Sequence, residues 1–189
     1  MSDSMTNPVL ETPRLRLRPL VESDAAAMHE AYGDPEAMRF WDVPASRDVA
    51  ETADRIRQSL DVGAQWHAAF AVTLRDGGRM VGMVNYHARN LHNRRLAVGW
   101  IVARPWWRQG IMREATPALL RYCFDDLGTH RIEARIEPDN AASIGLAECL
   151  GFEREGLMRD WMFVGGQPRS VWLYARLRPG AALTDDDRC

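Results

Sequence analysis

The residues best placed to do chemistry begin with a short segment that opens a predicted helix. This segment, Trp107-Arg108-Gln109-Gly110-Ile111-Met112-Arg113, contains a glycine and follows a predicted strand. In such a strand-to-helix turn several backbone N–H groups point to one place, and the positive end of the helix dipole adds to their field. Arg108 and Arg113 add guanidinium groups that can bind phosphate oxygens in pairs. The segment therefore predicts a phosphate-binding site.

A second candidate segment, Asn140-Ala141-Ala142-Ser143, opens a predicted helix that stops at Gly151. An asparagine at a helix start can cap the helix through its side-chain oxygen, or its carboxamide can contact a ligand. Ser143 offers a hydroxyl that can also cap the helix or can donate a proton in a reaction. Around the two segments the chain order is strand, helix, strand, helix.

In these residues the sequence resembles the GCN5-related N-acetyltransferases, the GNAT family. Trp107 to Met112 is similar to the pyrophosphate-binding motif of that family, and Asn140 to Ser143, with Leu150-Gly151-Phe152 behind it, is similar to its second signature. The pattern Pro-x-Trp…Gly-x-Met-x-Glu-Ala, from Pro105 to Ala115, is most similar to the branch that acetylates the N-termini of ribosomal proteins. The resemblance extends over most of the chain.

The resemblance implies a mixed α/β fold with a central, mostly antiparallel twisted sheet of about seven strands and about four flanking helices. One parallel pair of strands splays apart, and the pantetheine arm of the cosubstrate acetyl-CoA lies in the gap. Backbone groups of Ile101 and Val102 would hold this arm. The implied cofactor-binding residues are Ile101, Val102, Trp107, Arg108, Gln109, Gly110, Ile111, Met112, Arg113 and Asn140.

Two positions depart from the family pattern and bear on the mechanism. A tyrosine that many relatives carry seven residues after the asparagine is Ala147 here, and a glutamate that many carry on the strand before the turn is Ala97. Ser143 is therefore the predicted acid for the departing thiolate, and Glu133 the predicted base for the amine. The competing interpretation of Glu133 is an ion pair with a neighbouring arginine. Alternative bases are Glu137, Asp160, His67, His87 and ordered water.

The acceptor pocket is expected to have aromatic walls. Trp41 and Trp161 occupy segments that flank the acceptor groove in the family, and they are the predicted substrate-binding residues. An aromatic pocket suits an unfolded N-terminal peptide and a flat small molecule equally well.

Hydrophobic periodicity predicts the elements that must position these residues. Alternating patterns predict strands at 14–18, 66–75, 79–88, 94–103, 131–137, 152–164 and 169–177. Helical patterns and caps predict helices at 24–32, 34–40, 46–62 and 140–150, and a helix of about four turns after the turn that ends at Arg113. Because this long helix joins two strands, those strands should be parallel neighbours.

Composition bounds the class of protein. The 189 residues are 46% hydrophobic and 26% charged, with a net charge of −2, which suits one globular domain without a nucleic-acid footprint. We expect a single domain at 9–178, a disordered segment at 1–8 and an acidic flexible tail at 179–189. No apolar run is long enough for a membrane span and no signal peptide is recognisable, so cytoplasm is the expected location. Cys123, Cys149 and Cys189 show no metal-binding spacing, and no metal is expected.

The sequence thus predicts an acetyl-CoA-dependent N-acetyltransferase that moves an acetyl group directly to a primary amine. By resemblance, the preferred acceptor is a protein N-terminal α-amine. The alternatives are a small amine such as an amino acid, a polyamine or an antibiotic, and a non-catalytic acyl-CoA-binding module. Exposed edges of the final hairpin leave a homodimer open.

Overall fold

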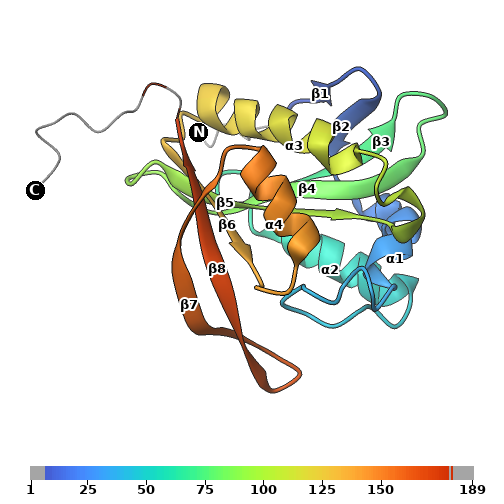
Figure 1. Cartoon of the computed structure of the whole chain (residues 1–189). Coiled ribbons are helices and arrows are strands. Elements are labelled where there is room, and N and C mark those ends of the chain that lie inside the picture. The colour runs from blue at the N-terminus through green and yellow to red at the C-terminus, as the bar shows by residue number, and fades with distance from the viewer. Residues whose placement is uncertain (1–6, 179, 181–189) are drawn as a thin grey trace, which may run out of the picture.

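The fold is organised on one sheet of eight strands, seen in a computed structural model that describes residues 7–178 and residue 180. The order across the sheet is β1-β2-β3-β4-β5-β6-β8-β7, and every pair is antiparallel except β5 with β6 (Figure 1). The strands are β1 (Leu10–Glu11), β2 (Leu15–Pro19), β3 (Ala68–Leu74), β4 (Met80–Asn90), β5 (Arg95–Val102), β6 (Arg131–Ile136), β7 (Glu153–Val164) and β8 (Gln167–Leu177). The predicted fold class is confirmed, and the two-residue β1 is the additional strand.

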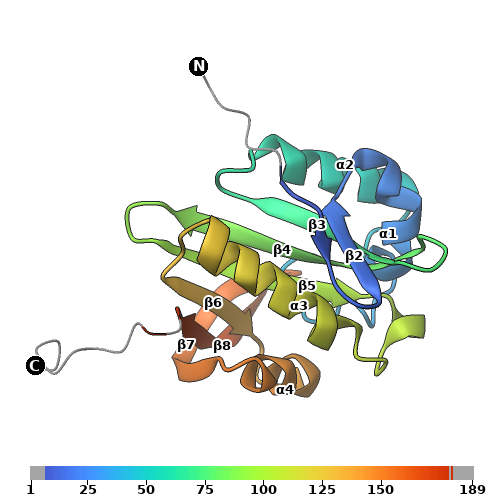
Figure 2. The same ribbon diagram turned by 90° about the horizontal axis from the view of Figure 1, so that it is seen from above.

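Helices cover both faces of the sheet (Figures 1 and 2). On one face lie α1 (Ala25–Tyr32) and α2 (Val49–Asp61), and on the other α3 (Ile111–Arg121) and α4 (Ala141–Cys149). Because side chains alternate along a strand, β3 supplies both cores: Phe70 packs in the cluster with α3, and Ala71 in the cluster with α1. None of the described helices has the length and apolar character needed to cross a bilayer.

The parallel pair is joined for only half its length. β5 and β6 pair at three positions, of which the last is Ala97 with Glu133. Beyond that point β5 continues against β4 as far as Val102, and β6 continues against β8 as far as Ile136. The two strands therefore separate in the middle of the sheet, as the family resemblance implies.

The crossover between these strands is helical through Asp126. α3 begins after Gly110 and contains Pro117, which removes one backbone hydrogen bond within the helix. The segment ends in a wider π-helical turn, in which the Leu127 N–H donates to the Tyr122 carbonyl at 3.0 Å. The predicted long helix is present in this form.

The predicted short helix at 34–40 is wrong. The chain makes separate turns there, with the Met38 N–H donating to the Asp34 carbonyl at 3.0 Å and the Trp41 N–H to the Met38 carbonyl at 3.0 Å. The Asp34 side chain accepts a hydrogen bond from the Glu36 N–H at 3.0 Å and so competes with a helix. The segment forms an irregular loop instead.

The final hairpin of β7 and β8 extends past the rest of the sheet (Figure 1). β7 is the edge strand, and its pairing with β8 is irregular between Met158 and Met162, where Asp160 has a positive φ of 48°. The predicted disordered N-terminus and flexible tail fall outside the described residues, apart from residues 7, 8 and 180, and stay predictions.

Candidate active site

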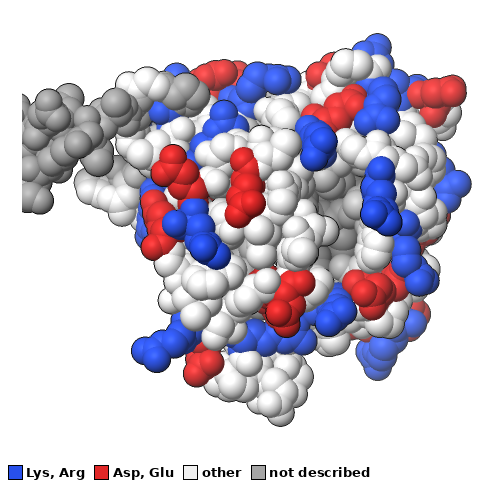
Figure 3. Space-filling model, viewed as in Figure 1, with Lys and Arg blue, Asp and Glu red and all other residues white. Residues whose placement is uncertain are grey.

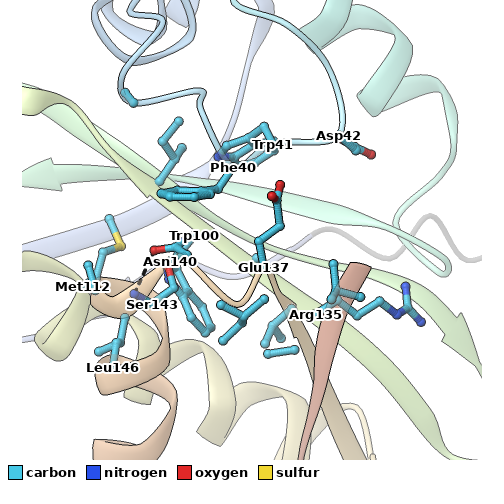
Figure 4. A pocket seen from close by; sticks show the side chains of 18 of the residues that line it. Phe40, Trp41, Asp42, Trp100, Met112, Arg135, Glu137, Asn140, Ser143 and Leu146 are labelled. Atoms are coloured by element: carbon cyan, nitrogen blue, oxygen red, sulfur yellow. Dashed lines mark hydrogen bonds between the residues drawn. The ribbon is translucent and has the colours of Figure 1, made fainter. Parts of the chain in front are cut away.

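A cavity of about 730 Å³ lies where β5 and β6 separate, and its lining comes from two sets of elements. The end of β5, the turn before α3 and the start of α4 form what we call the turn half: Ile101, Val102, Trp107, Arg108, Met112, Asn140, Ser143 and Leu146. The irregular loop, which continues to residue 48, forms what we call the loop half together with the start of β3, β4, the end of β6 and the final hairpin. Its lining residues are Glu36, Phe40, Trp41, Asp42, His67, Asn85, His87, Arg135, Glu137 and Trp161. Figure 4 shows the centre of this cavity.

The turn before α3 presents backbone N–H groups. Arg108 and Gly110 both have positive φ, 61° and 76°, which bends the chain sharply before the helix. Within the described residues the amides of residues 108–110 have no hydrogen-bond acceptor, and the first amides of a helix have none inside the helix. The Glu114 N–H is the first that bonds back, to the Gly110 carbonyl at 3.1 Å. The turn thus offers a row of free donors at a helix N-terminus, as predicted.

An ion pair from Arg14, the residue just before β2, holds this turn from outside. Arg14 Nε donates to Glu114 Oε2 at 2.6 Å, and both Arg14 Nη atoms lie 3.3 Å from the Gln109 carbonyl oxygen. Thr12 donates to the other Glu114 oxygen at 2.7 Å. Burial would raise the pKa of Glu114, but the hydrogen bonds from Thr12 and Arg14 lower it, so the carboxylate stays charged. Sequence patterns did not reveal this clamp.

Two predicted cofactor residues use their side chains inside the turn. The Trp107 indole N–H donates to the Val102 carbonyl at 2.8 Å, and the Gln109 amide donates to the Pro105 carbonyl at 2.8 Å. The first bond ties the turn to the end of β5, and the second closes the turn on the segment just after that strand. Ile111 packs into the core rather than into the cavity. These residues therefore shape the turn, and its free donors belong to the backbone.

Asn140 and Ser143 meet at the start of α4. The Asn140 side-chain oxygen accepts from the Ser143 N–H at 3.1 Å, so the asparagine caps the helix. The Ser143 hydroxyl oxygen in turn accepts from the Trp100 indole N–H at 3.2 Å, a contact that joins α4 to β5 (Figure 4). Trp100 fills one lone pair of this oxygen, and among the described residues the hydroxyl has no acceptor for its own proton, so it can donate to a ligand in the cavity.

In the loop half, Glu137 is fixed by an arginine of the hairpin. Arg169 Nη1 donates to Glu137 Oε1 at 2.9 Å and to the Arg39 carbonyl at 2.8 Å, so one side chain links β6, β8 and the irregular loop. Glu137 extends from the end of β6 toward Phe40 and Trp41 (Figure 4). Its second oxygen has no partner among the described residues, which leaves it available to a ligand.

The position of Glu133 does not support its predicted role as the base. Its side chain is 8% exposed and contacts three guanidinium groups: Arg131 at 2.9 Å, Arg135 at 3.4 Å and Arg95 at 3.5 Å. It does not line the cavity. Glu133 is the last residue of β6 that pairs with β5, so it lies where the sheet is still closed and not in the gap. Its contacts with three arginines fit the ion-pair interpretation better than the role of a base.

Two histidines lie on the floor of the loop half. Burial, together with the charges of Arg135 and neighbouring His67, lowers the pKa of His87 to about 4. Burial also lowers the pKa of His67, whose Nε2 lies 2.6 Å from Ser59 Oγ. At neutral pH both rings are uncharged, and such a weakly basic His87 is a poor proton acceptor. The described residues contain no cluster of His, Cys, Asp or Glu placed to hold a metal ion.

The structure brings most of the predicted residues to one place. Trp41 and Trp161 face the same cavity as Ser143 and the turn, whereas Asp160 and Glu133 do not line it. Sequence reasoning did not select Phe40, Asn85 or Arg135 as site residues. These residues belong to three separate segments of the chain. No local sequence pattern therefore shows that they line one cavity.

Comparison with known proteins agrees with this geometry. Residues 14–153 match the family model described as "Acetyltransferase (GNAT) domain", so the chain belongs to the GNAT family of acetyltransferases. It is similar to "Uncharacterized N-acetyltransferase p20" of Bacillus licheniformis, with 30% identity over 170 residues that cover 89% of this chain and 96% of the relative. The chain is accordingly an N-acetyltransferase, and enzymes with this fold take the acetyl group from acetyl-CoA.

Two further comparisons concern the fold and a part of the chain. The crystal structure of a GNAT acetyltransferase from Bacillus anthracis has a TM-score of 0.80 and 25% identity, covering 90% of this chain and 98% of that one. The Escherichia coli ribosomal protein uS5-alanine N-acetyltransferase is 37% identical over 82 residues, 43% of this chain and 42% of that enzyme.

Proposed function

We propose that this enzyme acetylates the α-amine at the N-terminus of a protein, by direct transfer from acetyl-CoA in a ternary complex. The observation that carries the proposal is the cavity at the separation of β5 and β6, with free backbone donors at one end and aromatic walls at the other. The similarity to the Escherichia coli enzyme that acts on ribosomal protein uS5 supports this choice of acceptor.

The turn half fits acetyl-CoA, which would supply an activated thioester. The free amides of residues 108–113 and the nearby Arg108 suit a pyrophosphate. Past Ala97, the edge of β5 that faces β6 has no strand partner. The Ala103 N–H donates to the Val81 carbonyl of β4, so by alternation the backbone groups of Ile101 also face β4 and those of Val102 face the gap. The Val102 N–H can therefore pair with an extended amide-bearing arm, which Ile101 would contact through its side chain. The Asn140 amide nitrogen, which has no partner within the described residues, is a further donor toward this arm.

Ser143 would act as the acid. It lines the cavity beside Trp100, and the indole N–H fills a lone pair of its oxygen. That hydrogen bond orients the hydroxyl and makes it a better proton donor to a departing thiolate. This is the role that the sequence predicts for Ser143, and it stays a prediction that the kinetics of Ser143→Ala test.

Glu137 would receive the proton of the amine, in place of Glu133. It lines the cavity, lies past the end of β6 and keeps one oxygen free beside Phe40 and Trp41. Because Arg169 holds the other oxygen, the carboxylate is kept in one orientation. A water molecule between Glu137 and the amine would complete the path without further side chains.

A small polyamine is the second candidate acceptor. The cavity carries the acidic side chains of Glu36, Asp42 and Glu137, which suit a cationic ligand. The solved spermidine N-acetyltransferase of Vibrio cholerae shares the fold, with a TM-score of 0.76 and 22% identity. Trp41 and Trp161 would contact the acceptor in both cases.

An acceptor panel tests the proposal. We expect acetyl-CoA-dependent acetylation of peptides with a free N-terminus, no reaction with the same peptides blocked at the N-terminus, and slower reaction with spermidine. Peptide mass spectrometry together with release of free CoA measures all three. Faster reaction with spermidine than with every peptide would favour the second candidate, and a folded protein that does not bind acetyl-CoA would contradict both.

We also propose a cytoplasmic enzyme that forms a homodimer through β7. This edge strand exposes Leu157, Trp161 and Phe163, the last at 68%. Analytical ultracentrifugation of the wild type and of Phe163→Glu would show a dimer that the substitution disrupts. A monomeric wild type at micromolar concentration would contradict the dimer.

A further inference from the structure

Three polar atoms on the floor of the loop half have no hydrogen-bond partner within the described residues. They are Oδ1 of Asn85, Nδ1 of His87 and Nε of Arg135, and each is buried in the cavity lining. Asn85 is only 9% exposed. Nearly all buried polar atoms in proteins are paired, so three such atoms in one cavity mark a place that suits the polar groups of a ligand.

The strand register brings Asn85 over the point where the sheet opens. Asn85 is paired with Gly99 of β5, two residues past the last contact between β5 and β6. A Cβ atom at Gly99 would lie 2.6 Å from the Asn85 side-chain oxygen. Because glycine stands at that position, the carboxamide lies across β5, two residues from Ile101 and on the same face of the sheet.

The positive charge of Arg135 is not balanced within its own ion-pair cluster, although Glu36, Asp42 and Glu137 line other parts of the cavity. Its nearest carboxylate is Glu133 at 3.4 Å, which is shared with Arg95 and Arg131. Arg131 also pairs with Glu155 at 2.6 Å. Within the described residues, three arginines therefore share two carboxylates. The cluster keeps one net positive charge beside the cavity.

The guanidinium of Arg135 lies at the far end of the cavity from the turn half. Its Cζ is 4.9 Å from the centre of the Trp161 ring, which holds the group by a cation–π contact. Figure 4 shows the Arg135 side chain extending away from Asn140 and Ser143, with Glu137 between them. An acceptor whose amine is on the Ser143 side of Asn85 would thus have its other polar group on the side of His87 and Arg135.

We propose that this floor binds an acceptor that carries a carboxylate near its reactive amine. Arg135 Nε and the neutral ring of His87 donate to the carboxylate, and the Asn85 oxygen accepts from the amine. This inference rests on the proposed acetyl transfer and narrows its acceptor. The carboxylate can come from the acidic side chain of an N-terminal residue or from the α-carboxylate of a free amino acid, and the two sources are tested separately.

Matched acceptors on the wild-type enzyme test the proposal first. The pairs are the peptide amides Asp-Ala-Ala-NH₂ and Asn-Ala-Ala-NH₂, and free L-methionine with L-methioninamide. In at least one pair we expect kcat/KM to be about tenfold higher for the acid, the size of one charge-assisted hydrogen bond. The amine of methioninamide is less basic, which by itself favours the amide, so a preference for methionine would come from the site. Equal or better use of the neutral member in both pairs would overturn the proposal.

Two arginine variants test whether Arg135 causes the preference for the acidic acceptor. Arg135→Gln should raise KM for the preferred acid about tenfold and leave the neutral member unchanged. The matched control is Arg95→Gln, which also removes a contact with Glu133 but lies outside the cavity lining, and it should keep the preference. A preference that survives in folded Arg135→Gln would show that Arg135 does not bind the carboxylate.

A binding measurement separates this proposal from acetyl transfer itself. Turnover of any amine with acetyl-CoA supports the transferase, whatever the preference. Without turnover of any acceptor, calorimetry in the presence of CoA decides the subsite alone. Its ligands are the N-acetylated members of both pairs: N-acetylmethionine with N-acetylmethioninamide, and the N-acetylated Asp and Asn peptide amides. Tighter binding of the acid by about tenfold in at least one pair supports the subsite, and equal binding in both pairs, as expected when ordered water fills the floor, overturns it.

Discussion

The turn half and the loop half of the cavity differ in the atoms that they present. The turn half offers mainly backbone: the free amides of 108–113, the unpaired edge of β5 and the first turn of α4. The loop half offers side chains from the irregular loop, β4, β6 and the hairpin. A backbone site suits one invariant ligand, since most substitutions leave it intact. A side-chain site can change its acceptor with one substitution.

Gly110→Glu tests whether the turn half depends on backbone alone. The residue has a φ of 76°, so a side chain there is strained, and a carboxylate would repel phosphate. We expect acetyl-CoA affinity to fall about a thousandfold, measured by calorimetry. Gly128→Glu, at a φ of 64° in the turn before β6, carries similar strain outside the cavity and should bind normally. Normal binding by Gly110→Glu would place the phosphate elsewhere.

The protein should lose stability at low pH, because the loop half buries a neutral histidine. The pKa of His87 is about 4, below its value of about 6.5 in the unfolded chain. As pH falls from 6.5 to 4, the unfolded state gains a proton that the native state does not bind, so the free energy of unfolding falls by roughly 3 kcal/mol.

Urea denaturation at pH 7 and pH 4.5 measures this difference. His87→Gln should remove most of the decrease, whereas His92→Gln, at an exposed position, should retain it. Identical pH dependence in both variants would mean that His87 is solvated, and the contrast between the two halves would be weaker.

Ser143→Ala tests the one side chain that we assign to catalysis in the turn half. We expect kcat to fall about 10²-fold with unchanged acetyl-CoA affinity, since a positioned acid contributes on that order. The matched control is Ser170→Ala on β8, whose hydroxyl accepts from the Asp160 N–H at 3.1 Å outside the cavity lining. An unchanged kcat in Ser143→Ala would leave Ser143 as a contact of Trp100 only.

Arg169→Gln gives the smallest expected effect and tests whether the loop half binds the acceptor and not acetyl-CoA. It removes the bonds to Glu137 and to the irregular loop, so KM for the acceptor should rise about tenfold. Acetyl-CoA affinity should not change. Arg57→Gln removes an exposed pair with Glu22 far from the cavity and serves as the control. A change in acetyl-CoA affinity would show that the two halves are coupled.

The same contrast explains what the sequence could predict. The turn and the start of α4 are contiguous, so glycine, capping residues and strand patterns specify them locally. The choice between Glu133 and Glu137 depends instead on where β5 stops pairing with β6. Both residues follow the same alternation, but Glu133 lies at the last residue pair between β5 and β6, and Glu137 lies just past the end of β6. No local sequence pattern predicts where the pairing of β5 with β6 ends.

The irregular loop shows a second limit. Asp34 and Pro35 are typical of a helix start, yet the Asp34 side chain bonds to the Glu36 amide and the chain turns away. The arginine cluster around Glu133 likewise joins three strands. Such contacts between distant segments decide which polar groups face the cavity, and single-sequence patterns do not contain them.

The clamp of Arg14 on Glu114 has a consequence for how the enzyme assembles. These residues are 100 positions apart, and closing so long a loop costs chain entropy. During synthesis Arg14 and β2 emerge early, but the contact with Glu114 can form only after the turn at 108–113 and the start of α3 have been made. In pulsed hydrogen exchange we expect the amides of α3 from Glu114 onward, which are hydrogen-bonded within the helix, to gain protection together with β2 and later than the β7/β8 hairpin. Competence to bind acetyl-CoA would then mark the end of folding, so the cosubstrate would preferentially stabilise chains whose sheet is complete.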